Sequence, residues 1–187
     1  NLVFGKWLTH SRWWPDYNIR LFKKGAVSWN EVIHAVPMTQ GKGVDMEVRE
    51  ENAIIHHHYD SLEQYIERMN RYTSIQAKRK MADGYKFNCC DLLTAPPGEF
   101  FSRFFAGEGY RDGLHGFAIA LLQAVSELVV YLKVWQEEGF KEEDVDLNNF
   151  AGGVAKINSD LNYWIADAKV KTKGGVVNRI KRKLRVR

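Results

Sequence analysis

The densest group of residues that could bind a polar ligand lies near the start of the chain, at residues 10–22. Two neighbouring indoles, Trp13 and Trp14, can stack on the face of a sugar ring, or one of them can belong to the core. The planar guanidinium of Arg20 can bind phosphate oxygens through two parallel hydrogen bonds, although an ion pair on an edge strand is the alternative. Both interpretations stay open for these side chains.

Other potential ligand groups carry less weight. Residues 56–58 are three consecutive histidines, but alternate residues of a strand point to opposite faces, so the three cannot converge on one metal ion. Asp144 and Asp146 have the spacing of a metal motif, yet they stand in an acidic stretch that suits a solvated helix start. Cys89 and Cys90 are adjacent, and neighbouring cysteines rarely bridge each other, which favours a reducing compartment.

The elements that would position these residues change along the chain. Residues 1–60 are expected to form strands and loops, with strands at residues 2–7, 18–22, 26–29 and 53–56. A helix is expected over residues 61–83, capped by Ser61, with its buried face formed by apolar residues spaced by three and four: Leu62, Tyr65, Ile66, Met69 and Tyr72.

More helices are expected in the second half. Pro96-Pro97 should open a short helix over residues 98–105, and Asp112 can cap a helix over residues 113–138. The apolar stretch 117–132 is shorter than the roughly 20 residues that a membrane span needs, so a buried or interfacial helix is expected. Another helix should cover residues 145–170, although Gly152-Gly153 weakens it.

The charge distribution separates an acidic body from a basic tail. The net charge is +4, but residues 169–187 contain nine Lys or Arg and no Asp or Glu, which leaves −5 for the other 168 residues. Apolar Val176, Val177, Ile180 and Leu184 form a narrow face among these cations, as in a helix that lies on a membrane surface. Nucleic-acid binding is the rival interpretation, but no nucleic-acid motif precedes the tail and no aromatic residues are interleaved with it.

Five segments, in order, carry a resemblance to family-two glycosyltransferases, notably those that add sugars to the lipopolysaccharide core. The first runs from Trp13-Trp14-Pro15-Asp16 into Arg20-Leu21-Phe22-Lys23-Lys24-Gly25. The others are Trp29 to His34, His56 to Tyr59 with the start of the following helix, Pro96 to Phe105, and Gly109 to Phe117. The resemblance covers about residues 3–138, and the chain looks like the C-terminal, acceptor-side half of such an enzyme.

The resemblance implies an α/β fold: the C-terminal part of a Rossmann-like GT-A domain, followed by long amphipathic helices. It implies a divalent cofactor, Mg²⁺ or Mn²⁺, held mostly by a missing N-terminal half, with His34 as a possible ligand or diphosphate contact; a structural histidine is the alternative. The family's Glu after this histidine is Ala35 here, so either Asp16 or Glu31 would supply the catalytic carboxylate, or the activity would differ or be absent. Arg20 would bind the diphosphate, and the acceptor would meet Trp13, Trp14, His56 and Tyr59.

Four regions follow from these expectations: closing strands at 1–60, a helical acceptor and membrane-docking region at 61–139, a helix at 140–173 and a basic amphipathic tail at 174–187. The first hypothesis is part of an inverting enzyme that moves a hexose from a nucleotide sugar to a lipid-linked saccharide, at the cytoplasmic face of the bacterial plasma membrane. The second is a non-catalytic, membrane-associated interaction module. No nucleic acid is expected, and a homo-oligomer or a separate N-terminal half is a possible partner. The expected membrane contacts are Phe100, Phe101, Phe104, Phe105, Arg179, Lys181, Arg182, Lys183 and Arg185.

Overall fold

The computed structural model describes residues 1–29 and 37–185. Contacts between residues divide the chain into two units. The larger unit combines Asn1–Trp14 with His56–Arg187, and the smaller unit is Pro15–Ile55. The small unit is therefore inserted, in sequence, between two parts of the large one.

The large unit is helical, which corrects the expected fold class. The structure is 60% helical and only 6% strand, so it is not a Rossmann-like α/β domain of the GT-A type. The apolar runs interpreted as buried strands explain the error. Leu21 is 97% exposed and Ile55 is 76% exposed, and neither residue lies in a strand. A short apolar run forms a buried strand only where partner strands and a covering layer exist.

A small sheet begins the large unit. Strands β1 (Leu2–Val3) and β2 (Lys6–Trp7) pair as an antiparallel hairpin, and β5 (His57–Tyr59) adds parallel to β1. The hairpin turns at Phe4 and Gly5, with φ angles of 51° and 80°, as a two-residue turn of the type I′ class requires. No strand forms at residues 53–56, where one was expected, and β5 begins at His57 instead. The strand expected over residues 2–7 is divided by the turn into β1 and β2.

Helix α1 (Leu62–Ala82) forms as expected, and Ser61 caps it by accepting a 3.2 Å hydrogen bond from the Gln64 N–H. Its buried face differs from the expected one. Tyr65, Thr73 and Ala77 are buried, whereas Leu62 and Ile66 are about half exposed. A polar Thr73 reaches the interior because its hydroxyl donates to the Met69 carbonyl within the helix.

Helix α2 (Cys89–Phe101) begins earlier than expected and contains both prolines in its interior. Asn88 caps it by accepting from the Cys90 N–H at 2.9 Å. The last turn widens into a π-helical segment, η2 (Ser102–Ala106), in which the Gly107 N–H donates to the Ser102 carbonyl. The prolines failed as a start signal because a stronger cap, Asn88, precedes Pro96 by eight residues.

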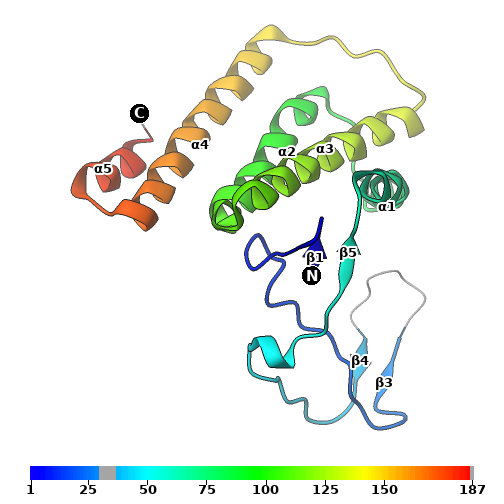
Figure 1. Ribbon diagram of the computed structural model, residues 1–187. Coiled ribbons are helices and arrows are strands. Elements are labelled where there is room, and N and C mark those ends of the chain that lie inside the picture. Colours follow the sequence, from blue (N-terminus) through cyan, green and yellow to red (C-terminus); the bar gives the residue numbers. More distant parts are fainter. Residues whose placement is uncertain (30–36, 186–187) are drawn as a thin grey trace. The chain divides into compact units, whose positions relative to one another are not determined.

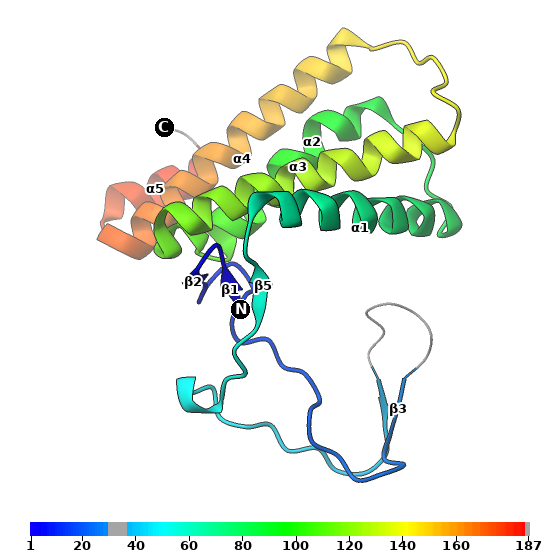
Figure 2. The ribbon, with the colours of Figure 1, turned by 45° about the vertical axis from the view of Figure 1, so that its right-hand side comes forward.

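Helix α3 (Gly113–Glu137) follows the 3₁₀ turn η3 (Gly109–Asp112) and packs against α1 and α2. Figure 2 shows α1 and α3 side by side, and Figure 1 shows α2 next to α3. Two cores hold these helices together. One joins the sheet to the helices through Val3, Leu8, Trp13, Tyr59, Tyr65 and Ile119. The other contains Ala77, Val130 and Val134.

Helices α4 (Leu147–Lys173) and α5 (Val176–Leu184) form a hairpin after α3 (Figure 1). Gly153 lets α4 approach α2 closely, because a Cβ atom there would lie 2.9 Å from the Leu93 side chain. The glycine that weakens the helix in sequence terms therefore has a packing role. The turn between α4 and α5 uses Gly174 and Gly175, both with positive φ.

The small unit has little regular structure in its described part. Strands β3 (Val27–Ser28) and β4 (Met38–Thr39) pair antiparallel, and a 3₁₀ turn, η1, covers Glu50–Asn52. No strand forms at residues 18–22.

Candidate functional site

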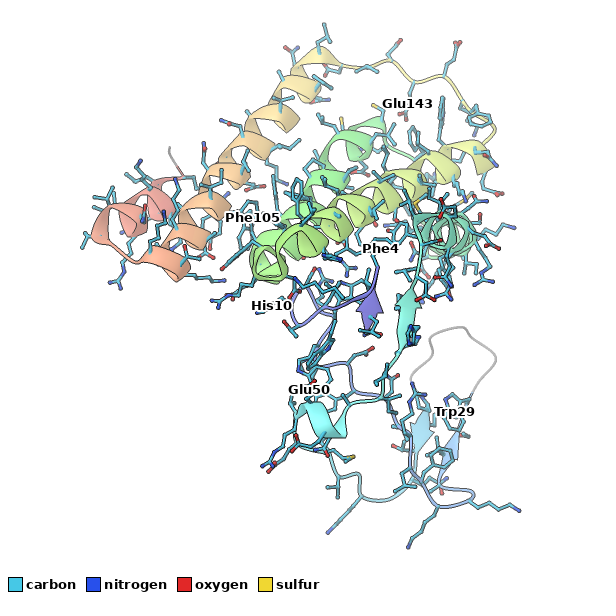
Figure 3. All side chains as sticks on the ribbon, in the orientation of Figure 1. Phe4, His10, Trp29, Glu50, Phe105 and Glu143 are labelled. Atoms are coloured by element: carbon cyan, nitrogen blue, oxygen red, sulfur yellow. The ribbon has the colours of Figure 1, made fainter. Side chains whose placement is uncertain are left out.

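A polar cluster joins the N-terminal loop to the start of α3. One oxygen of the Asp112 carboxylate accepts from the Thr9 hydroxyl at 3.0 Å and from the Thr9 N–H at 3.3 Å. The other oxygen accepts from the His10 N–H at 3.0 Å. The His10 ring nitrogen Nδ1 lies 3.2 Å from the first oxygen. Figure 3 shows His10 beside the first turn of α3. We call these three residues the His10–Asp112 site.

The electrostatics favour an ionised Asp112. Burial raises the pKa of this carboxyl, but hydrogen bonds from His10 and Thr9 outweigh burial and leave the pKa below its ordinary value. The carboxylate also stands at the N-terminus of α3, where the helix dipole favours negative charge. Lys6 adds a hydrogen bond of 2.7 Å to the Asp112 main-chain carbonyl. Asp112 thus binds the loop instead of capping its own helix with its side chain.

Close backbone approach makes this geometry possible. A Cβ atom on Gly116 would lie 1.9 Å from the Gly109 carbonyl oxygen, so any other residue at 116 would push η3 away from α3. The Ser11 N–H donates to the Gly107 carbonyl at 2.7 Å and fixes the loop on the same turn. The position of Asp112 therefore depends on the close approach of Gly109 and Gly116, which a Cβ atom on Gly116 would prevent.

Aromatic rings pack against one another around β5. The Trp13 and His58 ring centroids are 5.0 Å apart and nearly perpendicular. Tyr59 lies 4.8 Å from Tyr65 on α1, and the Arg68 guanidinium lies 5.5 Å from the Tyr59 ring centre. Burial raises the pKa of Tyr59. Trp13 and Tyr59 thus belong to the core, which was the alternative interpretation for one of the indoles.

The remaining predicted acceptor residues lie at the surface of this sheet. Trp14 is half-buried and packs edge-on against Trp7 with centroids 5.2 Å apart. His56 is exposed, and its Nδ1 lies 2.7 Å from the side-chain oxygen of Asn1. The rings of His56 and His58 are 5.0 Å apart on one side of the strand. His57 lies near Asp60 instead, at 3.4 Å, as the alternation of a strand requires.

A cluster of phenylalanines lies next to the site, where α2 ends. Phe101 is buried, whereas Phe100, Phe104 and Phe105 are half-buried, and Phe100 and Phe104 also meet Phe117 of α3. Arg12 connects this cluster to the loop, because it donates to the Ser102 hydroxyl and lies 4.0 Å from Glu99. The expected membrane contact of these rings stays a prediction.

The predicted residues for the diphosphate and the metal belong to the small unit. Asp16 and Arg20 are exposed, and the Asn18 amide donates to the Asp16 carboxylate at 3.3 Å. His34, with Glu31 and Ala35, lies outside the described residues. Within residues 1–29 and 37–185, no group of three or more His, Cys, Asp or Glu side chains could hold a metal ion.

Helix α3 has a second apolar side that the core does not cover. Its exposed apolar residues recur every three to seven positions along the helix, and we call them the outer face of α3: Leu114, Phe117, Leu121, Val125 and Leu132. By length and composition, the segment Gly109–Glu137 could cross a membrane, with a mean hydropathy of 1.8 and 33% of its most apolar window buried. Large exposed apolar surfaces on a protein mark interaction sites.

The chemistry available at the His10–Asp112 site is orientation of an imidazole. If Nδ1–H donates to Asp112, then Nε2 of His10 is an acceptor that can take a proton from a bound hydroxyl. Within the described chain, no hydrogen bond engages Nε2, and the His10 side chain is 32% exposed. Sequence reasoning missed this pair, because Asp112 was interpreted as a helix cap. The glycines at 109, 113 and 116 are the signal that a close approach was needed there.

Comparisons with known proteins identify no relative. No protein-family model matches the sequence, no curated protein is similar to it, and no solved structure resembles the fold. The chain's own residues therefore supply every argument about its function.

Proposed function

We propose that this chain is the acceptor-side part of a bacterial family-two glycosyltransferase, acting at the cytoplasmic face of the plasma membrane. In this proposal, the complete enzyme moves a hexose from a nucleotide sugar to a lipid-linked or lipopolysaccharide-core saccharide. The chain contributes the acceptor-binding and membrane-docking surfaces. The helical fold shifts the emphasis of the proposal, because the helices form the body of the large unit rather than an appendix to a sheet.

One observation supports the proposal most: four of the five segments that carry the resemblance, or residues directly beside them, meet in space. His10, three residues before the first segment, binds Asp112 of the last one. Trp13 of the first segment packs on His58 of the third, and Arg12, directly before the first segment, reaches Ser102 and Glu99 of the Phe-rich helix. These segments are about a hundred residues apart at most in sequence, yet they build one polar cluster. Motifs that shared only composition would have no reason to converge.

The proposed division of roles follows from exposure. In the large unit, His10, held by Asp112, orients a saccharide hydroxyl through Nε2, and Trp14 and His56 offer ring surface. Asp16 keeps its proposed role as the catalytic carboxylate, Arg20 as the diphosphate contact, and His34 at the diphosphate or the metal. A divalent ion such as Mg²⁺ or Mn²⁺ would neutralise charge on the departing diphosphate.

The outer face of α3 supports the membrane part of the proposal. Five apolar side chains between 36% and 77% exposed follow one side of the helix over about five turns. Transfer of one such side chain from water to an apolar phase is worth roughly 1.5–3 kcal/mol when burial is complete. A saccharide acceptor attached to a lipid is presented at the bilayer surface, so a docking face on the helix that follows Asp112 is expected.

The alternative is a non-catalytic, membrane-associated interaction module. Ala35 favours it, because the family has a carboxylate at that position. The two candidates agree on membrane contact and differ on saccharide binding, so saccharide binding decides between them.

The test titrates the 187-residue chain with lipopolysaccharide-core oligosaccharides freed of lipid, and saturation-transfer NMR measures the binding. We expect saturable binding, which His10→Ala weakens about fivefold, the effect of one neutral hydrogen bond of roughly 1 kcal/mol. His57→Ala is the matched control and should bind normally. Vesicle binding without saccharide binding would favour the interaction module. Saturable, metal-dependent binding of a uridine-diphosphate sugar would overturn the division of roles, since the donor site would then lie within this chain.

A further inference from the structure

Helix α5 packs against α4 with its polar side and turns its apolar side outward. Its four apolar residues, Val176, Val177, Ile180 and Leu184, are between 52% and 70% exposed. Asn178, Lys181 and Arg182 are half-buried against α4. An amphipathic helix on a protein surface ordinarily packs the other way, with its apolar stripe towards the core. The orientation of α5 therefore needs both a force that holds it and a partner that covers its outer side.

Ion pairs supply the force. Arg182 lies 2.9 Å from Asp167, a carboxylate of α4 that is only 5% exposed, and Arg185 lies 2.6 Å from Asp160. Asp167 also receives Lys171 at 3.3 Å. These contacts anchor α5 at its C-terminal end and fix its rotation about its own axis. Two cations expected at the membrane, Arg182 and Arg185, are thus engaged within the protein.

Four further cations in and near α5 lack such partners among the described residues. Within the described residues, no acidic group forms an ion pair with Arg179, Lys183, Lys169 or Lys181. The last two line a groove of about 410 Å³ between α4 and α5, together with Leu161, Asn162, Ile165, Ala166 and Asn178. Unpaired positive charge therefore borders both the groove and the outward apolar side of α5.

We propose that α5 is a membrane-binding helix held outside-in, whose apolar side enters the interface of a bilayer containing anionic phospholipids. The apolar residues bind the acyl region, and the unpaired cations bind phosphate headgroups. Charge complementarity selects this occupant, because Lys169, Arg179, Lys181 and Lys183 form no ion pair within the described residues and residues 169–187 contain no acid. This proposal rests on the membrane-docking surface of the proposed function and names anionic phospholipid as its partner. It requires neither saccharide binding nor enzyme activity.

The test uses co-sedimentation of the 187-residue chain with vesicles of phosphatidylcholine, with and without about one third phosphatidylglycerol, near physiological salt. We expect binding to the anionic vesicles that falls as salt rises. The variant Ile180→Asn with Leu184→Asn should abolish the contribution of α5, and unfolding curves should not change because both residues are exposed. Arg179→Gln and Lys183→Gln should each weaken binding about fivefold, the effect of one cation near an anionic surface.

One control variant tests whether the position of a cation matters. Arg71→Gln removes an exposed cation from α1, far from the tail in sequence, and should leave binding unchanged. Equal binding by the Ile180→Asn/Leu184→Asn variant and the parent chain would overturn the proposal, even if the outer face of α3 still bound vesicles. Tight binding of the tail to duplex DNA or single-stranded RNA at the same salt, without vesicle binding, would also overturn it. Loss of saccharide binding alone would affect only the proposed function.

Discussion

Asp112 accepts hydrogen bonds from the main-chain N–H of His10 and lies within 3.2 Å of its ring nitrogen, so a single carboxylate fixes both the backbone and the imidazole. Replacing Asp112 with Asn removes the charge and one acceptor. Hydrogen bonds to a charged group contribute roughly 1.5–3 kcal/mol. We expect Asp112→Asn to lower the free energy of unfolding by about 3 kcal/mol, measured by urea denaturation. Asp144→Asn, in an exposed linker, should change it by less than about 0.5 kcal/mol.

The same carboxylate makes stability depend on acid. The pKa of Asp112 is lower in the folded protein than its ordinary value, so its contribution is complete above the ordinary carboxyl pKa and is lost as pH falls through the folded pKa. Stability of the parent chain should fall between about pH 5 and pH 2 more steeply than that of Asp112→Asn. Parallel curves for the two proteins would contradict this, and unfolding curves at several pH values decide it.

Gly116 should tolerate no side chain. Its Cβ atom would lie 1.9 Å from the Gly109 carbonyl oxygen, which is backbone and cannot rotate away. We expect Gly116→Ala to destabilise the protein by about 3 kcal/mol or more, measured by thermal unfolding. Gly152→Ala is the matched control within α4, because no atom lies within 4 Å of its Cβ position. That change should stabilise by up to about 1 kcal/mol through helix propensity.

Tyr65 makes the chain sensitive to alkali. Burial raises its pKa from 10.0 to about 12, although a hydrogen bond with Ser126 partly offsets the effect. Because the folded pKa is the higher one, the stabilising effect of the neutral phenol is complete below pH 10 and is lost as pH rises towards 12. Tyr65→Phe should remove this loss, at a cost of roughly 1 kcal/mol at neutral pH from the lost hydrogen bonds of the Tyr65 hydroxyl with Ser126 and Gln123. An unchanged alkaline transition in the variant would refute the assignment.

The outer face of α3 should bind lipid without contributing to folding. We expect Leu121→Lys and Val125→Lys to reduce sedimentation with vesicles of phosphatidylcholine while leaving the unfolding temperature nearly unchanged, because both residues are 44–47% exposed. Ile75→Lys on α1, which is 41% exposed, is the control and should retain full binding. A marked loss of stability in the α3 variants would show that this face is covered by protein.

Helices were predictable to the extent that local signals agreed. Ser61 and the periodicity after it gave α1 within a residue, and Asp112 gave the start of α3. The start of α2 was wrong, because a proline pair can stand inside a helix that a better cap has already begun. The sheet was wrong for a different reason. Ile54-Ile55 has the composition of a buried strand, and only the presence of partner strands, which no local pattern reports, decides whether it is buried.

The candidate site illustrates the same limit. The residue types at its centre were visible in the sequence, but the pairing of His10 with Asp112 depends on a contact across a hundred residues. The approach of two glycine backbones that allows this contact has no periodicity to detect. Likewise, the sequence predicted an amphipathic basic helix in the tail, and α5 forms there, whereas its membrane binding stays a prediction. The sequence did not indicate that Asp160 and Asp167 would bind two of its arginines.

The chain leaves the large unit after Trp14 and re-enters it at His56. These two points are neighbours, because the ring centroids of the nearby residues Trp13 and His58 are 5.0 Å apart. Pro15–Ile55 is therefore a long insertion whose two ends lie close together. Its length, sequence and structure can therefore vary without altering the connectivity of the helical body. Specificity carried by this insertion could diverge rapidly while the scaffold stays the same, and a short linker across the gap would isolate the scaffold for study.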